Sequence, residues 1–502
     1  MKVAQPIFSF RAPLISLRSF QRHNTSDQRS LRGPVPLNGF LDSIFRSKDT
    51  APVEIEQDAL GQALLDALFS KHQTSSSLMN GVQCSDISGQ GRGLVATQTV
   101  REGQVVLNIP FDAAITPEKA AQMSSLRDII TSSRYASSSG DEAKTTLPDW
   151  TLLAVWLAEL VSSQTPPPPP PSLSNNNHAV HAAYAAVLPA YQNTSCVLEW
   201  TENEVNWLRG SYLYNMALDI RTAADTSWKE LEPIISHAER AGLIKKGVLT
   251  EKTLKHAFAL LLSRLIRINF NSRTGGGGGG GGISGGISGD YDRNLGQNEV
   301  EVLCPVADFV NHDSTCSSFL QIDEENQNIV LVADRKYRPG EQIFASYGQK
   351  TSGEMLLSYG FLPEEGSNVH DACLLSIGGV GEGVEQISKE VFPLKMGAVP
   401  QKLLDALCSA AGESNNGVNV SGEQLLVNLC KQKLETYSIN LEDARAELLR
   451  LRGTTARDST GGKEERDATT INVKRRDAVL RILVQEQKIL ARTIFLMKQQ
   501  LK

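Results

Sequence analysis

Two short segments with the pattern of β-strands lie far apart in the chain. The first, 91–110, contains two apolar runs joined by a turn at 101–103, and the second, 328–348, repeats this arrangement with Pro339 and Gly340 in its turn. Proline followed by glycine suits the central positions of a type II turn. Because the sequence between the two segments is mostly helical in pattern, the strands of one sheet must come from distant parts of the chain. This pattern predicts an α+β fold.

The intervening and following sequence has the spacing of amphipathic helices. Apolar residues from Leu254 to Ile268 recur on one helical face, and beyond about residue 354 the pattern stays helical to the end, with a second apolar face from Val479 to Met497. Arg264 lies at the border of the first face. An arginine there can aim its head into a cleft or simply extend to solvent, and the spacing leaves both interpretations open.

These patterns divide the chain into three parts. We expect an unstructured segment over residues 1–50, an α+β domain over 51–350 with a helical insertion at about 115–300, and an all-α domain over 351–502. A proline-rich stretch at 165–177 and a glycine-rich stretch at 274–290 have few side chains to bury, so we expect both to be surface loops of the insertion.

The first 50 residues differ in composition from the rest. They hold eight Lys or Arg against three Asp or Glu, whereas the whole chain of 502 residues has a net charge of −6. Such a basic, Ser-rich and Thr-rich start is typical of an organelle transit peptide, and an ordinary disordered terminus has a similar composition. Chloroplast and mitochondrion cannot be separated on these grounds.

Composition also excludes several classes of protein. No apolar run approaches the roughly 20 residues that span a bilayer, and the acidic balance argues against a nucleic-acid binder with a broad basic face. The seven cysteines are scattered and form no CxxC pair, so we expect neither a disulfide scaffold nor a paired-cysteine zinc site. With no HExxH or GxSxG motif, a metalloprotease or a serine hydrolase is not indicated, and we expect no metal.

Four short stretches remain as carriers of chemistry. In chain order they are QGRG (90–93), Ser263-Arg264, ADFVNHD (307–313), and FASYG (344–348) followed by SYGFL (358–362). Each alone is weak, since a glycine pair or an Asn-His pair is more often a structural turn than a site. Their order makes the chain resemble the SET-domain protein methyltransferases, and within them the class similar to the Rubisco large-subunit methyltransferase. The resemblance covers about residues 60–500.

The resemblance implies a fold and a cofactor. The fold is a SET-domain β-fold interrupted by a helical insertion and followed by a helical substrate-binding domain, and the cofactor is S-adenosylmethionine. The positions that match the family's cofactor-binding residues are Gln90, Gly91, Arg92, Gly93, Arg264, Asn311 and His312. Glycines permit the close backbone approach that such a site needs, and a guanidinium suits the cofactor's carboxylate.

It also implies where the substrate binds. Tyr347 matches the family's catalytic tyrosine, while Asp308, Phe319 and Tyr359 match positions on the substrate side. Aromatic walls exclude water and interact favourably with an ammonium group. Two positions depart from the pattern: Asp313 stands where serine is usual after Asn-His, and Ile268 stands where well-known members have a substrate-contacting arginine.

The function implied by the resemblance is methylation of a lysine on a non-histone, plastid protein that docks on the C-terminal helical domain. Two alternatives stay open: a protein-histidine methyltransferase, and a SET-like docking protein without catalysis. We expect a monomer that binds neither nucleic acid nor membrane. Mitochondrion and cytoplasm are the alternative compartments.

Overall fold

The computed structural model describes most of the chain outside its first 54 residues. The described ranges are 55–72, 78–88, 90–129, 147–162, 176–191, 195–269, 284–285, 299–323, 325–377, 390–413, 421–454 and 463–501. The predicted transit segment, 1–50, lies outside them, as do most of the two low-complexity stretches. No described helix is both long enough and apolar enough to cross a bilayer.

Two small sheets contain the strand segments that the sequence singles out. A five-stranded sheet has the order β1 (Ile55–Gln57), β2 (Val82–Ile87), β3 (Gly91–Ala96), β11 (Gln342–Ala345) and β8 (Asn311–His312). A three-stranded sheet has the order β4 (Val105–Pro110), β10 (Asn328–Val332) and β9 (Leu320–Asp323). Each segment singled out in the sequence therefore gives one strand to each sheet.

The two segments pair with one another across the fold. Strand β3 pairs with β11, and β4 pairs with β10, both antiparallel, while an isolated bridge between Val100 and Tyr337 links the connecting turns. Strand β8 lies parallel to β11, with Asn311 beside Phe344. The prediction that distant segments assemble the sheets is confirmed.

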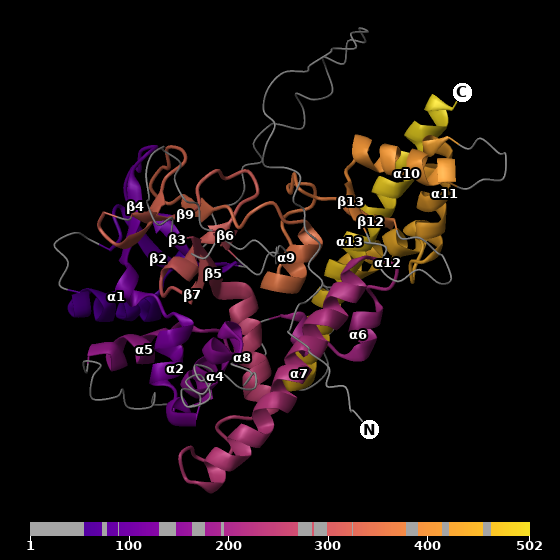
Figure 1. The fold of residues 1–502 in the computed structure, drawn as a ribbon. Coiled ribbons are helices and arrows are strands. Elements are labelled where there is room, and N and C mark those ends of the chain that lie inside the picture. Colours follow the sequence, from indigo (N-terminus) through magenta and orange to yellow (C-terminus); the bar gives the residue numbers. More distant parts are fainter. Residues whose placement is uncertain are drawn as a thin grey trace.

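The helical insertion packs beneath these sheets (Figure 1). Its helices are α2 (Pro117–Met123), α4 (Asp149–Ser162), α5 (Asn176–Val187), α6 (Glu202–Asn206), α7 (Leu213–Arg240) and α8 (Glu251–Arg264). The earlier helix α1 (Ala59–His72) packs against α5. A third sheet has the order β6 (Ser284–Gly285), β5 (Leu265–Asn269) and β7 (Glu299–Leu303). Within the predicted loop 274–290, the pair 284–285 is therefore a short strand.

One predicted helix ends earlier than its apolar spacing indicates. The stripe from Leu254 to Ile268 predicts a single helix, but α8 stops at Arg264 and β5 begins at Leu265. The reason is tertiary: the backbone from Leu265 onward pairs with β7, whose register begins opposite Leu303. Arg264 therefore lies at the junction of a helix and a strand.

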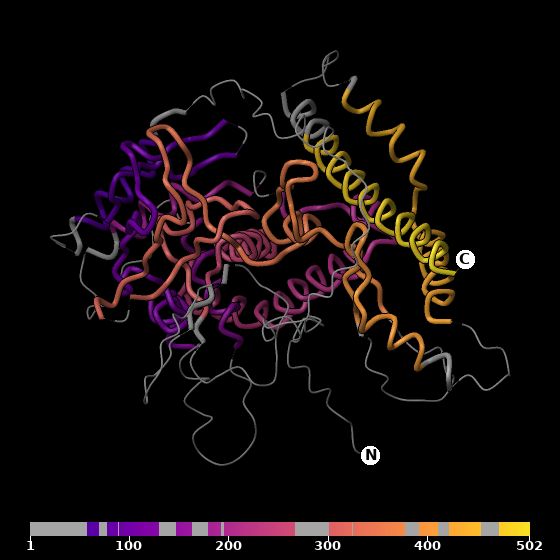
Figure 2. The backbone as a smooth tube through the Cα atoms, turned by 90° about the horizontal axis from the view of Figure 1, so that it is seen from above, coloured from indigo at the N-terminus to yellow at the C-terminus, as the bar shows by residue number. Residues whose placement is uncertain are grey.

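The C-terminal region is mainly helical and lies apart from the sheets, with α9 between them (Figure 1). Its elements are α9 (Ser352–Tyr359), β12 (Cys373–Ile377), β13 (Glu390–Leu394), α10 (Gln401–Glu413), α11 (Gly422–Glu435), α12 (Leu441–Thr454) and α13 (Lys463–Gln500). The long helix α13 runs along the region beside α11 and α12 (Figure 2). The hairpin β12–β13 is a correction to the expected all-α domain: Cys373, Leu375 and Leu394 bury it in the core.

Candidate functional site

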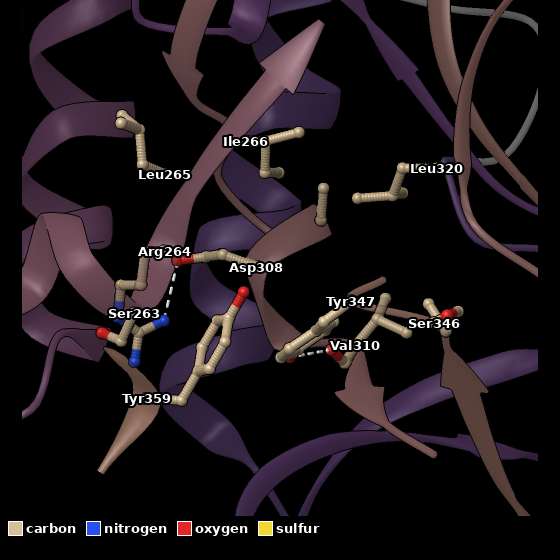
Figure 3. A pocket seen from close by; sticks show the side chains of 12 residues that line it. Ser263, Arg264, Leu265, Ile266, Asp308, Val310, Leu320, Ser346, Tyr347 and Tyr359 are labelled. Carbon is tan, nitrogen blue, oxygen red and sulfur yellow. Dashed lines mark hydrogen bonds and ion pairs between the residues drawn. The ribbon is translucent and has the colours of Figure 1, made fainter. Parts of the chain in front are cut away.

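A cleft lies where α8 meets β5, facing the end of β11 and the end of α9. Arg264, Asp308, Tyr347 and Tyr359, all selected from the sequence, line it together (Figure 3). They come from four separate parts of the chain: the last residue of α8, a 3₁₀ turn at Ala307–Phe309, the residues after β11, and the last residue of α9. The fold therefore brings residues from distant parts of the chain together in this cleft.

One wall of the cleft is a buried ion pair. Arg264 Nη1 donates to Asp308 Oδ2 at 2.8 Å, and the Tyr184 hydroxyl donates to the same oxygen at 3.0 Å. The Asp308 side chain is only 1% exposed. Burial opposes the charge of Arg264, but the charge and hydrogen bond of Asp308 outweigh burial and raise the pKa of the guanidinium. Arg264 therefore stays a cation in this low-dielectric place.

This wall is not fully paired within the chain. Arg264 Nε and Asp308 Oδ1 are both buried, and neither has a hydrogen-bond partner among the described residues. An unpaired buried polar atom costs about 1–3 kcal/mol. Such a cost is sustained where a ligand supplies the missing partner.

The opposite wall is aromatic. The ring centroids of Tyr347 and Tyr359 lie 4.7 Å apart, and Phe361 follows at 6.2 Å from Tyr359. The Tyr347 hydroxyl donates to the carbonyl of Val310 at 2.6 Å (Figure 3). Burial raises the pKa of both phenols well above the ordinary value. Tyr347 is therefore a neutral phenol whose proton is held by a carbonyl, so it is not a tyrosinate base.

The Asn-His pair lies behind these walls, on β8. Asn311 Nδ2 donates to the carbonyl of Arg92 at 3.2 Å, and the Tyr347 amide donates to His312 Nδ1 at 3.0 Å. The Ala345 carbonyl lies 3.3 Å from the same nitrogen, and burial lowers the pKa of His312. Nε2 is also buried with no partner in the described part of the chain.

The glycine motif contributes backbone to the same place. Gly93 is so close to its neighbours that a Cβ there would lie 2.9 Å from both Asn311 Nδ2 and Gln342 Nε2. Gly91 has a φ of +74° and open space around it, and Gln90 is exposed. The GRG motif therefore forms the start of β3, and it brings backbone against the Asn-His strand.

The Arg92 side chain points away from this role. It forms an ion pair with Asp58, donates through Nη1 to the carbonyl of Val187 at 2.8 Å, and lies 5.0 Å from the centre of the Phe309 ring. Its side chain thus ties β3 to α5 and to the 3₁₀ turn. The backbone carbonyl of Arg92 is the part that meets Asn311.

Two residues beside the cleft differ from those that the sequence selected. Leu320, the first residue of β9, lines the cleft, whereas its half-buried neighbour Phe319 does not. Tyr184 was not selected, because a tyrosine in an alanine-rich helix carries no sign of a partner 124 residues away. The only sequence signal for Tyr184 is that it is a large aromatic residue in a stretch of small ones.

No group of three or more His, Cys, Asp and Glu side chains that could hold a metal ion occurs in the ranges that the structure describes. Of the seven cysteines, Cys304 and four others are buried, and all seven are free thiols. Burial raises the pKa of the Cys304 thiol, and the nearby Asp308 carboxylate adds to the shift. A thiolate is therefore disfavoured beside the cleft.

Comparison with known proteins identifies the family. The model of the SET domain matches residues 91–348, about half of the chain. The chain therefore belongs to the SET-domain family, as its motif order predicts.

Relatives and solved structures agree with this assignment. The "SET domain-containing protein 8" of Schizosaccharomyces pombe is 24% identical over 293 residues, which are 58% of this chain and 56% of that protein. The "N-lysine methyltransferase setd6" of Salmo salar is 27% identical over 126 residues, 24% of this chain and 26% of that protein. The chain thus spans about half, or less, of the length of the curated relatives it matches.

Solved structures extend the likeness over more of the chain. A structure of Rubisco LSMT bound to AdoMet superposes with a TM-score of 0.54 at 19% identity, covering 88% of this chain and 92% of that one. The SET domain of LSMT bound to lysine and AdoHcy gives the same TM-score at 18% identity. At this identity the likeness concerns the fold, and it confirms the predicted arrangement of a SET domain followed by a helical region.

Proposed function

We propose that this protein is an S-adenosylmethionine-dependent protein-lysine N-methyltransferase. The observation that carries the proposal is the cleft itself, in which two half-buried tyrosines lie beside the Arg264–Asp308 ion pair, whose Arg264 Nε and Asp308 Oδ1 are buried without a partner among the described residues. Its family membership supports a methyltransferase, and the N-lysine methyltransferase among its relatives supports a lysine target.

The chain's own residues fit the cofactor. Arg264 offers a cation with a buried, unpartnered Nε for a carboxylate, and the Asn311 amide lies beside the backbone of Arg92 and Gly93. We assign Gln90 and Gly91 to the same binding segment, and the His312 backbone to its far side. When bound, S-adenosylmethionine supplies an electrophilic methyl group.

The residues around the cleft suit an amine acceptor. The Tyr347 hydroxyl donates its hydrogen bond to the carbonyl of Val310, so the lone pairs of its oxygen can accept a hydrogen bond from an ammonium or an amine. Tyr359 and Leu320 add apolar surface that excludes water. Desolvation lowers the pKa of an entering lysine, which allows it to lose its proton without a dedicated base. Asp308 holds Arg264, and through it the cofactor side of the cleft.

Calorimetric titration of S-adenosylmethionine into the full chain tests the cofactor site. We expect binding by the wild type and a loss of about 1–3 kcal/mol in Asn311→Ala, the scale of a lost buried polar contact. The matched control is Asn326→Ala, since Asn326 lies in an exposed turn and bonds only locally to Asp323. A folded wild-type protein that binds no S-adenosylmethionine would contradict the proposal and leave a docking protein on a SET scaffold.

A second experiment tests lysine as the acceptor. Labelled methyl transfer into a plastid extract, followed by mass spectrometry of the product, should locate the label on lysine and should lose it with Tyr347→Phe. Label on histidine would establish the alternative acceptor, and no transfer by a protein that binds the cofactor would leave the non-catalytic alternative.

We further propose a plastid, non-histone protein as substrate, docked on the helical region 351–502. The basic, Ser-rich start of the chain supports the compartment, and the helical region beside the cleft offers a surface for docking. Import of a fusion of residues 1–50 to a fluorescent protein tests the compartment. We also propose that the protein acts as a monomer, which light scattering checks.

A further inference from the structure

The short helix α9 positions one aromatic wall of the cleft. It has eight residues, and its last residue is Tyr359, whose ring lies against that of Tyr347. A helix this short is marginal by itself, so its place depends on what holds its two ends. The long helix α13 of the C-terminal region packs against it (Figure 1).

Two residues of α13 reach the two ends of α9. Gln485 Nε2 donates to Asp371 Oδ2 at 2.7 Å, and Arg481 Nη2 donates to the carbonyl of Pro363 at 2.9 Å. Residues four apart lie on the same face of a helix, so one turn of α13 makes both contacts. Pro363 follows closely after Tyr359, on the far side of the glycine that ends α9.

Asp371 in turn holds the start of α9. Its carboxylate accepts from the amide of Ser352 at 2.6 Å and from the Ser352 hydroxyl at 2.9 Å. A carboxylate also interacts favourably with the positive end of a helix dipole. Asn368 closes the loop by donating to the carbonyl of Lys350 at 2.9 Å and to Asp371 Oδ1 at 3.2 Å. The loop after α9 therefore folds back onto its beginning.

The same turn of α13 is itself anchored. Glu486, the neighbour of Gln485, accepts from the Ser211 hydroxyl and from the Tyr437 hydroxyl, each at 2.8 Å. Ser211 stands before α7 of the insertion, and Tyr437 follows α11 of the helical region. The turn 481–486 thus joins three parts of the molecule, so its contacts to α9 have a fixed base.

We propose that Arg481 and Gln485 are positioning residues that hold α9 at both ends and thereby fix Tyr359 against Tyr347. This inference rests on the proposed function for its effect on catalysis, because Tyr359 is assigned there to the substrate channel. It gives the C-terminal region a role in shaping the cleft in addition to any role in docking. Neither residue touches the cleft, so both act through α9.

The test uses Arg481→Met and Gln485→Met in the full chain, with Arg492→Met and Gln499→Met as matched controls. Both control residues are exposed on the same helix, and Arg492 contacts only the neighbouring Phe495 ring among the described interactions. We expect amide hydrogen exchange in α9 to become about tenfold faster in Arg481→Met and in Gln485→Met, because the rate of local opening sets the rate of exchange. Exchange in the core helix α4 should stay unchanged in all four variants, which separates loosening of α9 from global unfolding.

The kinetic readout separates positioning from general damage. With poly-L-lysine as the acceptor, kcat should fall about ten- to a hundredfold, the scale of a small misplacement at a reacting centre. The Kd for S-adenosylmethionine should remain within about twofold, because the cofactor residues lie on other elements. Exchange in α9 equal to that of the controls, or an affinity loss as large as the rate loss, would overturn the proposal. A wild type that binds no S-adenosylmethionine would instead contradict the proposed function. The exchange result would still decide whether Arg481 and Gln485 hold α9.

Discussion

Asp308 in the cleft and Glu486 in the turn of α13 are both buried carboxyl groups, but they are held in opposite ways. Asp308 faces the Arg264 cation, and two donors share its Oδ2 while Oδ1 has no partner in the described chain. Glu486 faces two hydroxyls, one on each oxygen, and burial raises its pKa. Each oxygen of Glu486 therefore has a hydrogen-bond partner, whereas Oδ1 of Asp308 has none among the described residues and retains capacity for a ligand.

The largest difference should appear when each carboxyl becomes an amide. Asp308→Asn leaves the Arg264 cation buried without its counter-charge, and we expect a loss of about 3–5 kcal/mol in the free energy of unfolding. Glu486→Gln keeps the shape and faces hydroxyls that can donate or accept, so its effect should be below about 1 kcal/mol. Urea unfolding of both variants measures the two. Equal losses would contradict the distinction between the two carboxyls.

Removing a tyrosine hydroxyl should affect the rate at Tyr347, in the cleft, and the stability at Tyr437, beside Glu486. Tyr347→Phe removes the hydroxyl in the cleft and should lower kcat about a hundredfold, as loss of one oriented polar group at a reacting centre does. Tyr437→Phe removes one donor from Glu486 and should leave kcat unchanged while lowering stability by about 1–3 kcal/mol. Methyl-transfer rates and urea unfolding, measured on both variants, check the contrast. A rate loss in Tyr437→Phe would mean that the Ser211 hydroxyl alone does not hold Glu486, and that the loosened turn 481–486 reaches the cleft through α9.

These contrasts also define what the sequence could predict. The order of the short motifs carries the resemblance to the SET-domain family, and that resemblance selects Arg264, Asp308, Tyr347 and Tyr359, which all line one cleft. The role of Tyr184 could not be predicted, since it arises from the packing of α5 against the 3₁₀ turn.

Other parts depend on pairings that local pattern does not contain. The apolar stripe around Arg264 fits a longer helix equally well, and only the pairing of β5 with β7 decides that the helix ends there. The sequence of β12 and β13 likewise fits a helical pattern, and their pairing with each other decides that they are strands. The contact of Gln485 with Asp371 joins residues 114 apart in the chain, and it follows from tertiary packing alone.

A third buried carboxyl sharpens the comparison through pH. Glu159 of α4 accepts from the Ser124 hydroxyl and the Ser125 amide, and no cation among the described residues pairs with it, so burial raises its pKa from 4.5 to about 7. Between those two values the folded protein keeps a proton that the unfolded chain has released. Stability from this group is therefore full below about pH 4.5 and is lost as the pH rises to about 7.

Glu159→Gln should remove this dependence. The difference in unfolding free energy between variant and wild type should shift in favour of the variant by up to about 1.4 kcal/mol per pH unit, the limit for one proton. Urea titrations at pH 5, 6, 7 and 8 give that difference, and the curve should flatten above about pH 7. A flat difference across the whole range would show that Glu159 is ionised in the folded protein.

The smallest expected effect compares two glycines that share a backbone conformation but not a location. Gly91, in the cofactor motif, and Gly103, in the turn before β4, have φ values of +74° and +78°, and neither has an atom within 4 Å of an added Cβ. Alanine at either position should therefore cost about 1 kcal/mol of stability through backbone strain alone. Thermal unfolding checks that the two losses match. S-adenosylmethionine titration then isolates the site: the affinity should fall only in Gly91→Ala, where a methyl group enters the space that the proposed cofactor approaches, and an equal affinity in both variants would remove Gly91 from the binding segment.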